Sequence, residues 1–551
     1  MGKAKDKKAP VTVPTLRWQD NFERITVNIF TVLVFIAFGF VALMSLFKTS
    51  TIDPEQYTYE HILYSDDNLL INLPLMVLFF MAIMFMRRKY DFFKRVNMTF
   101  MEVALVVYVL LLGLVWVLKV QCMPAADSAN IFYAASGAAK NDFTNFRSNA
   151  VFYNHDYYKN NSYFMFYPFQ LGFVFICEMI YRVFGAKSAM PLEIINVLCV
   201  AAAYLGVAKI SKQLFKRRAI EFVSIILLVG CFQPILFTAF PYGNIMGMAF
   251  AIWACYFLIK YLQGGKWTLL IPSGVLLVLA TLAKYNNMIY LVAFVIVLLI
   301  HAIKQKKWQS LAFILAICIC TVGASKLIIL SYESRSGQKF TSGVSQTLYL
   351  DIGVQESYMA PGWYTDIGMK TFMNSGFDTK SANAKAKQDI DRRMSAFTSK
   401  PDYALDFFSK KILSQWNEPS YESIWVSKVK SHYNGNVDSF VDSVYNKGLS
   451  KVLDFWFNFY MQGLFLLFAG GVFVMMLKGK TNMATVLLPL VLLGAFGYHM
   501  LFEGKSQYIL TYIILMIPTA AWAAITLAES KFNLLAKAND KSAEKTEEDK
   551  K

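Results

Sequence analysis

The chain has 551 residues, of which 56% are hydrophobic and 16% aromatic, and its mean hydropathy is +0.41. This composition excludes an ordinary soluble globular protein and indicates a polytopic membrane protein. The formal net charge of +17 raises the alternative of nucleic acid binding. However, the basic residues lie mostly in short segments beside apolar runs, where the positive-inside rule places them, so we expect no nucleic acid partner.

Apolar runs long enough to cross ~30 Å of hydrocarbon recur along the chain. They lie near residues 25–47, 69–86, 100–118, 166–184, 190–208, 220–238, 245–261, 267–283, 287–302, 309–330, 455–477, 484–501 and 508–528. A few of these runs are marginal, so we predict about 11–13 spans. The predicted fold class is an all-α polytopic membrane protein, with a transmembrane helix bundle and an extracellular helical loop domain.

The loops between the runs predict the organisation of the chain. We expect a basic cytoplasmic segment at 1–24, a transmembrane module at 25–330 with a first outer loop near 119–165, an extracellular loop domain at 331–454, C-terminal transmembrane helices at 455–529 and a disordered cytoplasmic tail at 530–551.

The basic loops predict two topologies that differ by one crossing. Counted from the N-terminus, the segment after Lys119 lies outside, whereas the basic segment 209–218 is expected inside. Only two clear apolar runs separate these segments, and two crossings cannot join opposite sides. Either one apolar segment is re-entrant or lies in the membrane plane, or 209–218 violates the rule.

The first outer loop holds candidate chemistry. Asp127 follows an apolar run and precedes the amphipathic sequence SANIFYAASGAA. A carboxylate there can deprotonate an acceptor hydroxyl, although it can equally cap a helix. His155 and Asp156 are a candidate base pair or metal ligands in an aromatic-rich stretch, but one His with scattered acids is no metal pattern. The seven cysteines form no disulfide framework or metal motif.

Charged residues also interrupt the late apolar sequence GYHMLFEGKSQYILTY, where Glu503 and Lys505 lie between two runs. Lys284 lies in a comparable turn, within LATLAKYNNMIYL. Ionisable residues at a membrane edge are costly to bury and are therefore functional hypotheses. The alternatives for Lys505 are snorkelling to the interface or a local ion pair with Glu503.

Several motifs follow in a fixed order. The acid at Asp127 is followed by YPFQLG (167–172), PGWYTDIGM (361–369), WNEPSYES (416–423) and EGKSQY (503–508). In this order they resemble the GT-C superfamily of membrane glycosyltransferases. More narrowly, the chain is similar to Gram-positive enzymes related to protein mannosyltransferases and to the aminoarabinose transferase of lipid A.

The resemblance implies an enzyme that takes a sugar from a polyprenyl phosphate carrier and passes it to a cell-surface acceptor, at the outer face of the cell membrane. It implies that Asp127 is the general base of an inverting transfer and that Lys505 and Lys284 bind the lipid phosphate. Residues implied to position donor or acceptor are Glu503, Tyr508, Gln507, Tyr167, Gln170, His155, Asp156, Asn244 and Trp416.

The chain departs from the pattern of these enzymes at two positions. Asn244 stands where a second acid is expected, and Gln507 stands where relatives tend to carry Arg. The first departure leaves a divalent metal without support, so no cofactor is expected, although a metal stays open. The second puts a bidentate phosphate clamp in doubt. The expected partners are a polyprenyl-phosphate sugar, a glycopolymer such as wall polysaccharide or teichoic acid, and membrane lipid.

Other functions remain open at this point. A lipid-linked sugar flippase or transporter would also need charged residues at membrane edges, but the chain shows no internal repeat. A surface-polysaccharide polymerase would use the same donors, and a non-catalytic scaffold would not need Asp127. The tryptophans of the large loop either line an acceptor groove or form the core of the loop; these are Trp363, Trp416 and Trp425.

Overall fold

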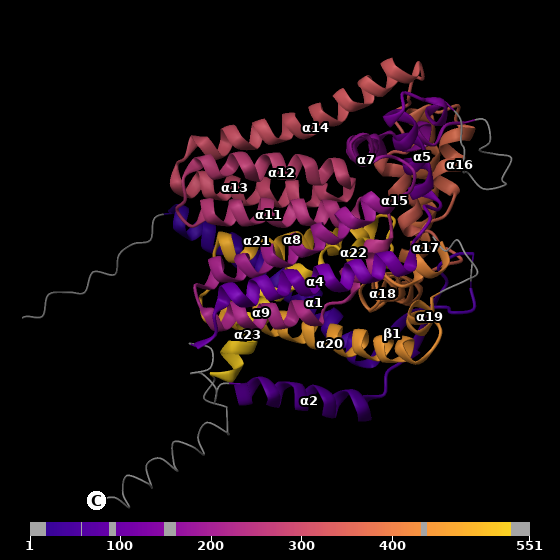
Figure 1. The fold of residues 1–551 in the computed structure, drawn as a ribbon. Helices are drawn as coiled ribbons and strands as arrows, with labels where there is room; N and C mark the ends of the chain where they lie inside the picture. Colours follow the sequence, from indigo (N-terminus) through magenta and orange to yellow (C-terminus); the bar gives the residue numbers. More distant parts are fainter. Residues whose placement is uncertain (1–17, 57, 87–94, 148–160, 431–437, 530–551) are drawn as a thin grey trace, which may run out of the picture.

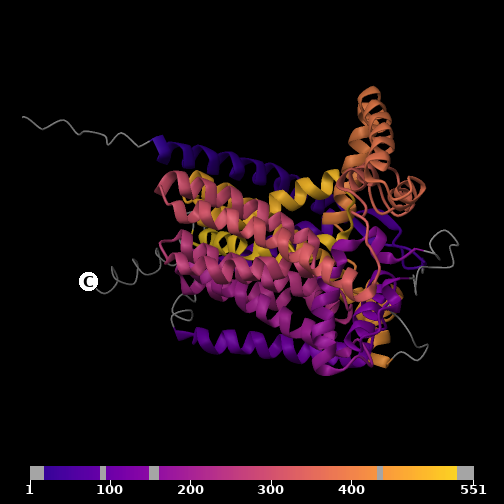
Figure 2. The same ribbon diagram turned by 90° about the horizontal axis from the view of Figure 1, so that it is seen from above.

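The computed structural model of the chain is a bundle of long helices with shorter helices gathered at one end (Figure 1). It describes residues 18–56, 58–86, 95–147, 161–430 and 438–529. The shorter helices lie at the same end of the bundle in a view turned by 90° (Figure 2). We call this the cavity end, because the cavity described below lies there, and the other the opposite end.

Every apolar run predicted from the sequence is helical. The helices are α1 (Trp18–Phe47), α2 (Leu69–Met86), α4 (Met98–Val120), α7 (Leu171–Phe184), α8 (Met190–Phe215), α9 (Arg218–Gly230), α10 (Gln233–Leu236), α11 (Asn244–Leu262), α12 (Leu270–Ala283), α13 (Met288–Gln305), α14 (Trp308–Ser336), α20 (Gly448–Leu477), α21 (Met483–Leu501), α22 (Ser506–Ile509) and α23 (Ile517–Ala528). Helices satisfy their own backbone hydrogen bonds, as hydrocarbon requires. The predicted all-α polytopic fold is confirmed.

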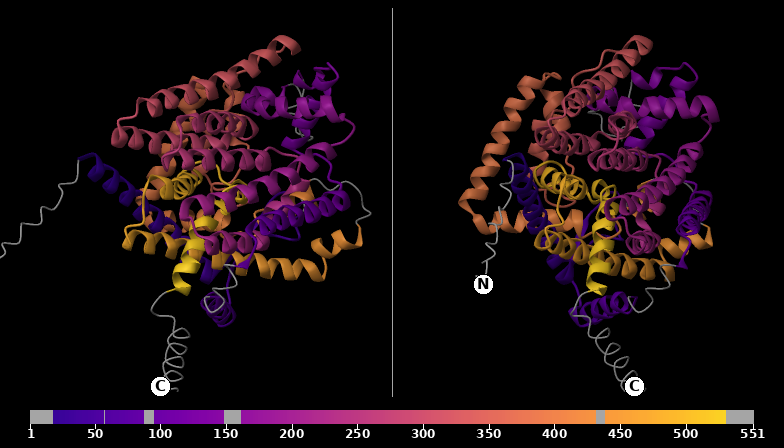
Figure 3. Two further views of the ribbon diagram at one scale, coloured as in Figure 1. Left: turned by 60° about the vertical axis from the view of Figure 1, so that its left-hand side comes forward. Right: turned by 90° about the vertical axis from the view of Figure 1, so that its left-hand side faces the viewer.

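These helices differ in whether their length and hydropathy suffice to cross a membrane. Within the described residues, eight are long and apolar enough to cross a membrane, and α9 with the segment 233–239 makes a pair bent by 47°, which is either a broken span or a re-entrant segment. The apolar helices in α2, α12 and α23 are shorter. Helices α2 and α14 lie at opposite edges of the bundle (Figures 1 and 3).

The connecting segments form shorter elements at the cavity end. They are α5 (Asp127–Ala139), α6 (Tyr163–Phe166), α15 (Gln346–Val354), α16 (Ile367–Asn374), α17 (Thr379–Ser399), α18 (Pro401–Trp416), α19 (Ser439–Tyr445) and a hairpin of β1 (Lys48–Ile52) and β2 (Ile62–Asp66). Single turns of 3-10 helix lie at Thr144–Phe146, Pro168–Gln170, Phe237–Ala239, Trp267–Leu269, Tyr285–Asn287 and Ile513–Met516, and a π-helical turn at Val426–Lys430. The predicted helical loop domain is therefore present.

The antiparallel hairpin between α1 and α2 was not predicted. Lys48 pairs with Asp66 in its register, and the hairpin is fixed to the loop domain by backbone hydrogen bonds. Ser50 N donates to Asn417 O at 2.9 Å, and Ile62 N donates to Met359 O at 3.0 Å. The segment between α1 and α2 is thereby held against residues that follow it by more than half of the chain.

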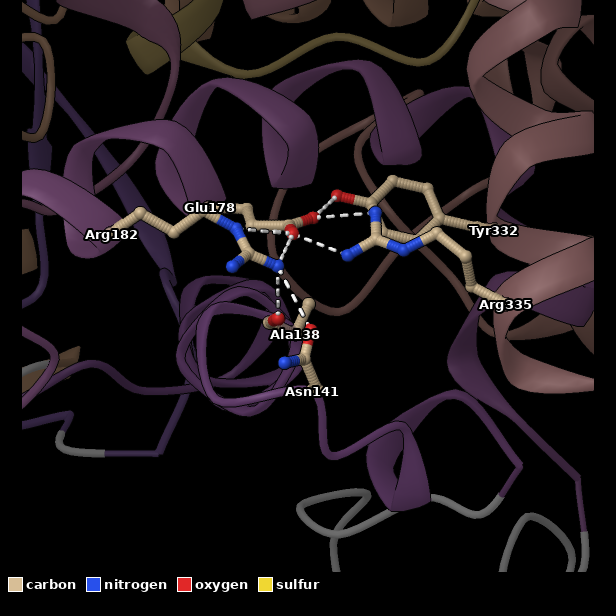
Figure 4. A network of polar contacts seen from close by, with 6 residues as sticks. All are labelled: Ala138, Asn141, Glu178, Arg182, Tyr332 and Arg335. Carbon is tan, nitrogen blue, oxygen red and sulfur yellow. Dashed lines mark hydrogen bonds and ion pairs between the residues drawn. The ribbon is translucent and has the colours of Figure 1, made fainter.

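Helix α7 accounts for the conflicting topology counts. Its start lies against the end of α12, where a Cβ added to Gly172 would lie 2.8 Å from Leu282 O. Its middle residue Glu178 contacts the last turns of α14, and Arg182 near its end contacts α5 (Figure 4). Both ends of α7 therefore lie at the cavity end, so α7 does not cross the bundle, and the crossing to the opposite end is made by α8.

A buried carboxylate fixes α7 in this position. Glu178 is only 1% exposed and accepts hydrogen bonds from the Tyr332 hydroxyl at 2.5 Å, from Arg335 Nη1 at 3.0 Å and from Arg182 Nη2 at 2.7 Å (Figure 4). Arg182 also donates to Ala138 O at 2.9 Å. Breaking such a buried pair costs about 3–5 kcal/mol, so the network ties α5, α7 and α14 together.

Candidate functional site

A cavity of about 1250 Å³ lies among the connecting segments at the cavity end. Its wall comes from the start of α5, the α6 segment, the turn after α12, α14, α15, residues 358–369 and the loop between α21 and α22. Tyrosines supply much of this wall, namely Tyr59, Tyr163, Tyr167, Tyr242, Tyr285, Tyr349, Tyr358, Tyr364, Tyr498 and Tyr508. A wall of aromatic faces and hydroxyl groups suits a sugar, which presents both C–H and O–H groups.

Most of the residues nominated from the sequence line this cavity. They are Asp127, Tyr167, Gln170, Lys284, Glu503, Lys505, Gln507 and Tyr508. Asn244 and Trp416 are buried outside its wall, and the Trp416 ring packs against Phe38 and Phe496. His155 and Asp156 lie outside the described residues.

Asp127 is the first residue of α5, but its carboxylate does not cap the helix. Ser128 Oγ makes the local hydrogen bonds instead, accepting from Ala125 N at 3.0 Å and donating to Ala125 O at 2.8 Å. Ala126 has φ 51° and ψ −129°, a backbone conformation that costs a non-glycine residue about 1–3 kcal/mol. Among the described residues, the Asp127 carboxylate has no hydrogen-bond or ion-pair partner. The strained turn thus presents an accessible carboxylate to the cavity.

The charge of Asp127 reaches the tyrosines around it. Burial raises the pKa of Tyr163 well above its ordinary value, and the nearby Asp127 carboxylate raises it further. The same two causes raise the pKa of Tyr242, which accepts a hydrogen bond from Gln170 Nε2 at 2.5 Å. These phenols stay protonated near Asp127, so they can act as hydroxyl groups toward a ligand but not as bases.

Lys505 is buried at the cavity wall, with 6% of its surface exposed, so it does not snorkel. Its Nζ lies 2.9 Å from Glu60 Oε1, and it lies 5.9 Å from the centre of the Trp363 ring. The sequence suggested Glu503 as the partner, but Glu503 Oε1 accepts a hydrogen bond from the Tyr508 hydroxyl at 2.9 Å. Burial opposes the charged form of Lys505, yet the Glu60 and Glu422 carboxylates outweigh burial and raise its pKa.

Lys284 faces the same space from the end of α12. Its Nζ lies 3.9 Å from the centre of the Tyr242 ring and 5.5 Å from that of Tyr508. A desolvated cation over an aromatic face gains about 0.5–2 kcal/mol, which holds the ammonium at the cavity wall. The two nominated lysines therefore lie on one cavity with the nominated acid Asp127.

The late motif EGKSQY is locked in place by the motif WNEPSYES. Glu422 Oε1 accepts from Ser506 Oγ and from Gln507 N, both at 3.1 Å. Tyr421 and Glu422 both adopt positive φ, at 50° and 60°, which is an unfavourable conformation for two successive non-glycine residues. Asn244 reaches the same motif, since its Nδ2 donates to Gln507 O at 3.2 Å.

Three charged residues of this region were not identified as site residues from the sequence. Glu60 is one of several acids in its loop, and Glu422 lies in a motif that was noted without a role for its acid. Lys411 follows the exposed Lys410 in a helix of mixed composition, yet it is fully buried and donates to Gly353 O and to Phe502 O. Of these three residues, only Glu422 had a signal in the sequence, namely its place in the motif WNEPSYES.

A metal was left open by the sequence. Among the described residues, no group of three or more His, Cys, Asp or Glu side chains lies close enough to hold a metal ion. The carboxylates at the cavity are instead bonded to lysine, tyrosine, serine or backbone groups, apart from Asp127. The donor set of the described residues does not fit a metal site.

Comparisons with known proteins show that part of this chain is similar to one protein family. Residues 170–329 match the sequence profile of the dolichyl-phosphate-mannose-protein mannosyltransferase family. This range contains Gln170, Asn244 and Lys284, while Asp127 and Lys505 lie outside it. No curated protein gives a significant sequence match to the chain.

Solved structures of one archaeal enzyme also align with the chain. The oligosaccharyltransferase AglB from Archaeoglobus fulgidus, in complex with an inhibitory peptide and a dolichol-phosphate, aligns at 13% identity with a TM-score of 0.38, over 77% of this chain and 50% of that one. The Archaeoglobus fulgidus oligosaccharyltransferase tethered with an acceptor peptide aligns at 11% identity with a TM-score of 0.39, over 77% and 49%. The chain thus spans about half the length of these structures. The family match over residues 170–329 confirms the resemblance to membrane glycosyltransferases of the GT-C superfamily.

Proposed function

We propose that the protein is a GT-C glycosyltransferase that moves a sugar from a polyprenyl phosphate to a cell-surface acceptor at the outer face of the cell membrane. One observation carries this proposal: residues from motifs far apart in the chain, with Asp127, line a single cavity at the end of the helix bundle. A carboxylate that has no partner among the described residues, two lysines and a tyrosine-rich wall are what a base, a phosphate and a sugar require.

In the proposed mechanism, Asp127 is the general base of an inverting displacement. The acceptor hydroxyl oxygen attacks the anomeric carbon, and its proton passes to the Asp127 carboxylate. The bond between the anomeric carbon and the phosphate oxygen breaks, and the lipid phosphate leaves with the electron pair. Lys505 and Lys284 stabilise the charge on the departing phosphate, because fixed cations in a cavity with little water act strongly on developing charge.

The remaining nominated residues receive positioning roles in this proposal. Tyr508 donates its only hydroxyl proton to Glu503 at the cavity wall, so the pair offers sugar hydroxyl groups the remaining carboxylate and phenol lone pairs as acceptors. Gln170 orients Tyr242 beneath Lys284. The acceptor class that we propose is a wall polysaccharide or teichoic acid, because the tyrosines offer stacking faces for glycan rings.

The proposal is tested by sugar transfer in membranes. Radiolabelled polyprenyl-phosphate sugars are supplied to membranes that carry wild-type protein or Asp127→Asn at equal expression. We expect transfer by the wild type to isolated wall polymer and a loss of about 10²-fold or more in the variant, as for removal of a general base. Asp142→Asn, which alters an exposed acid that does not line the cavity, is the matched control and is expected to keep full transfer.

Two results would contradict the proposal in different ways. Transfer that survives in Asp127→Asn would remove Asp127 as the base while leaving the enzyme in place. If the wild type transfers sugar from no polyprenyl-phosphate donor, the proposed enzymatic activity is wrong. If labelled lipid crosses the membrane instead, the protein is a flippase.

A further inference from the structure

The ion pair between Glu60 and Lys505 joins residues 445 positions apart in the chain. Both residues line the cavity, and both are nearly inaccessible, with exposures of 3% and 6%. A buried charge is held in place only when a partner compensates it, and removal of the partner leaves an unfavourable unpaired charge. Lys505 is therefore neutralised by an acid that belongs to a different part of the fold.

Glu60 reaches Lys505 from a well-anchored element. It lies two residues before β2, whose first residue Ile62 donates its backbone N–H to Met359 O. The neighbouring Tyr59 ring packs edge to face on Tyr358, with 4.6 Å between ring centres. The Glu60 carboxylate is thus placed by the hairpin and the loop domain together, independently of the helix ends that carry Lys505.

A lysine that binds a phosphate pairs with the negative charge of that phosphate. In this structure the Glu60 carboxylate already pairs with Lys505. Two anions on one ammonium repel each other, so a phosphate and Glu60 compete for the same cation. The Glu422 carboxylate also acts on the charge of Lys505, while its Oε1 is held by hydrogen bonds from Ser506 and Gln507. The position of Glu60 therefore weakens the binding of any anion to Lys505.

We propose that Glu60 is the resident counter-ion of Lys505: the phosphodiester of the lipid-linked donor displaces it, and Glu60 pairs with the lysine again when the lipid phosphate leaves. This inference rests on the proposed function, since it takes a lipid phosphate as the ligand. Glu60 is then a positioning residue that acts through Lys505. It keeps the buried lysine compensated between turnovers and prevents the phosphate product from binding too tightly.

The exchange predicts a gain of affinity when Glu60 loses its charge. Glu60→Gln keeps the shape and one hydrogen-bond acceptor of the side chain but removes the competing anion. We expect the variant to bind farnesyl phosphate, a short polyprenyl monophosphate, on the order of tenfold more tightly than the wild type. A purely structural Glu60 gives the opposite sign, because loss of a structural contact disorders the cavity and weakens binding.

The test measures dissociation constants of farnesyl phosphate with the purified full-length protein in detergent, for wild type, Glu60→Gln, Glu60→Asp and Lys505→Gln. Asp53→Asn is the matched control, because Asp53 lies in the same hairpin turn but contacts His61 and does not line the cavity. We expect tighter binding in Glu60→Gln, no change in Asp53→Asn and a loss of about tenfold or more in Lys505→Gln. Glu60→Asp retains the charge and is expected to bind no more tightly than the wild type.

Additional ligands identify the group that is recognised. Farnesol, which lacks the phosphate, is expected to show no difference between wild type and Glu60→Gln, and a difference would contradict an exchange of anions. Glu60→Gln is expected to increase the affinity for inorganic phosphate less than the affinity for farnesyl phosphate. An equal increase for both ligands supports the exchange but identifies the anion as free phosphate rather than a lipid phosphate.

The outcomes separate this inference from the proposed function. If the wild type binds farnesyl phosphate and Glu60→Gln binds it equally or more weakly, the counter-ion role is wrong and the proposed donor stands. If neither protein binds farnesyl phosphate or inorganic phosphate, the proposed donor class and the exchange are both wrong. Should Glu60→Gln fail to fold, Glu60→Ser is measured in its place, and the same gain or its absence decides.

Discussion

Lys411 carries an ammonium group into a part of the loop domain from which water is excluded. Burial lowers the pKa of Lys411 to about 7, while the Glu503 carboxylate acts in the opposite direction with a smaller effect. Its Nζ donates to Gly353 O and to Phe502 O, so it joins the loop domain to the segment that precedes Glu503. The protonation of one side chain outside the cavity wall therefore bears on the stability of the site.

The lowered pKa of Lys411 predicts how stability depends on pH. In the unfolded chain this lysine has its ordinary pKa near 10.4, so between pH 7 and about 10 the unfolded state binds more protons than the folded state. The free energy of unfolding must then rise with pH across this window and lose this contribution as pH falls toward 7. Thermal unfolding of the purified protein at pH 7, 8 and 9 measures the slope.

The neighbouring lysine provides the control for this prediction. Lys410 is exposed and pairs with Asp406 at 2.8 Å. We expect Lys411→Met to flatten the rise of thermal stability with pH, whereas Lys410→Met leaves it intact. An unchanged slope in Lys411→Met would show that other groups cause the pH dependence.

At the scale of single residues, the sequence identifies a site residue when the neighbours along the chain already make that residue unusual. Lys505 and Glu503 stand out because apolar runs flank them on both sides. Glu60 does not stand out, because its partner is 445 positions away and its own loop holds other acids. The burial of Lys411 is likewise a product of tertiary packing, since the carbonyl groups that it binds belong to Gly353 and Phe502, far away in the chain.

At the scale of elements, the contact between α11 and α12 sets the position of Lys284. Gly243 precedes α11, and a Cβ built on it would lie 1.9 Å from Ala283 O, in the residue directly before Lys284. Backbone atoms cannot yield as a flexible side chain can. Glycine is therefore required here by close approach, and its φ of −75° makes no such demand.

We expect Gly243→Ala to force α11 and α12 apart, displacing Lys284 and lowering the free energy of unfolding by about 1–3 kcal/mol, as overpacking does. Gly470→Ala is the matched control, because a Cβ on Gly470, within α20, would have no neighbour within 4 Å. Alanine at that position is expected to be neutral or slightly stabilising. Thermal unfolding and farnesyl phosphate binding, measured together, check both variants. Equal behaviour of the two variants would contradict the packing argument.

Elements differ in how well the sequence predicts them. The spans are predictable because hydrocarbon forces long apolar helices, and each predicted run is helical. Helix α7 is equally apolar at its start but does not cross the bundle, because Glu178 and Arg182 bind partners on α14 and α5. The β1–β2 hairpin carries no local signal, since the docking of its backbone on the loop domain stabilises it.

At the scale of the whole molecule, the position of α7 determines on which side of the membrane each later loop lies, because α7 does not cross the bundle. The segment between α7 and α8 must then share a side with the cavity, and the segment between α20 and α21 must lie on the other. Lys187 and Lys480 are exposed in these two segments, and Tyr358 is 55% exposed at the cavity.

Cysteine labelling in whole cells tests this arrangement. In a background without the exposed Cys320, we expect Lys187→Cys and Tyr358→Cys to react with a membrane-impermeant maleimide, and Lys480→Cys to react only after the cells are opened. Labelling of Lys187→Cys together with Lys480→Cys would show that α7 crosses the membrane. Protection of Tyr358→Cys in intact cells would place the cavity on the cytoplasmic side and contradict the proposed outer-face reaction.

The pairing of Glu60 with Lys505 has a consequence for biogenesis. A polypeptide is made from its N-terminus, so Glu60 and Asp127 are in place long before the ribosome reaches the loop between α21 and α22. Until that loop arrives, the wall of the cavity lacks Lys505 and also the segment that Glu422 holds. Nascent and truncated chains therefore cannot assemble the complete cavity wall, and the last loop of the membrane domain determines when the proposed phosphate site is complete.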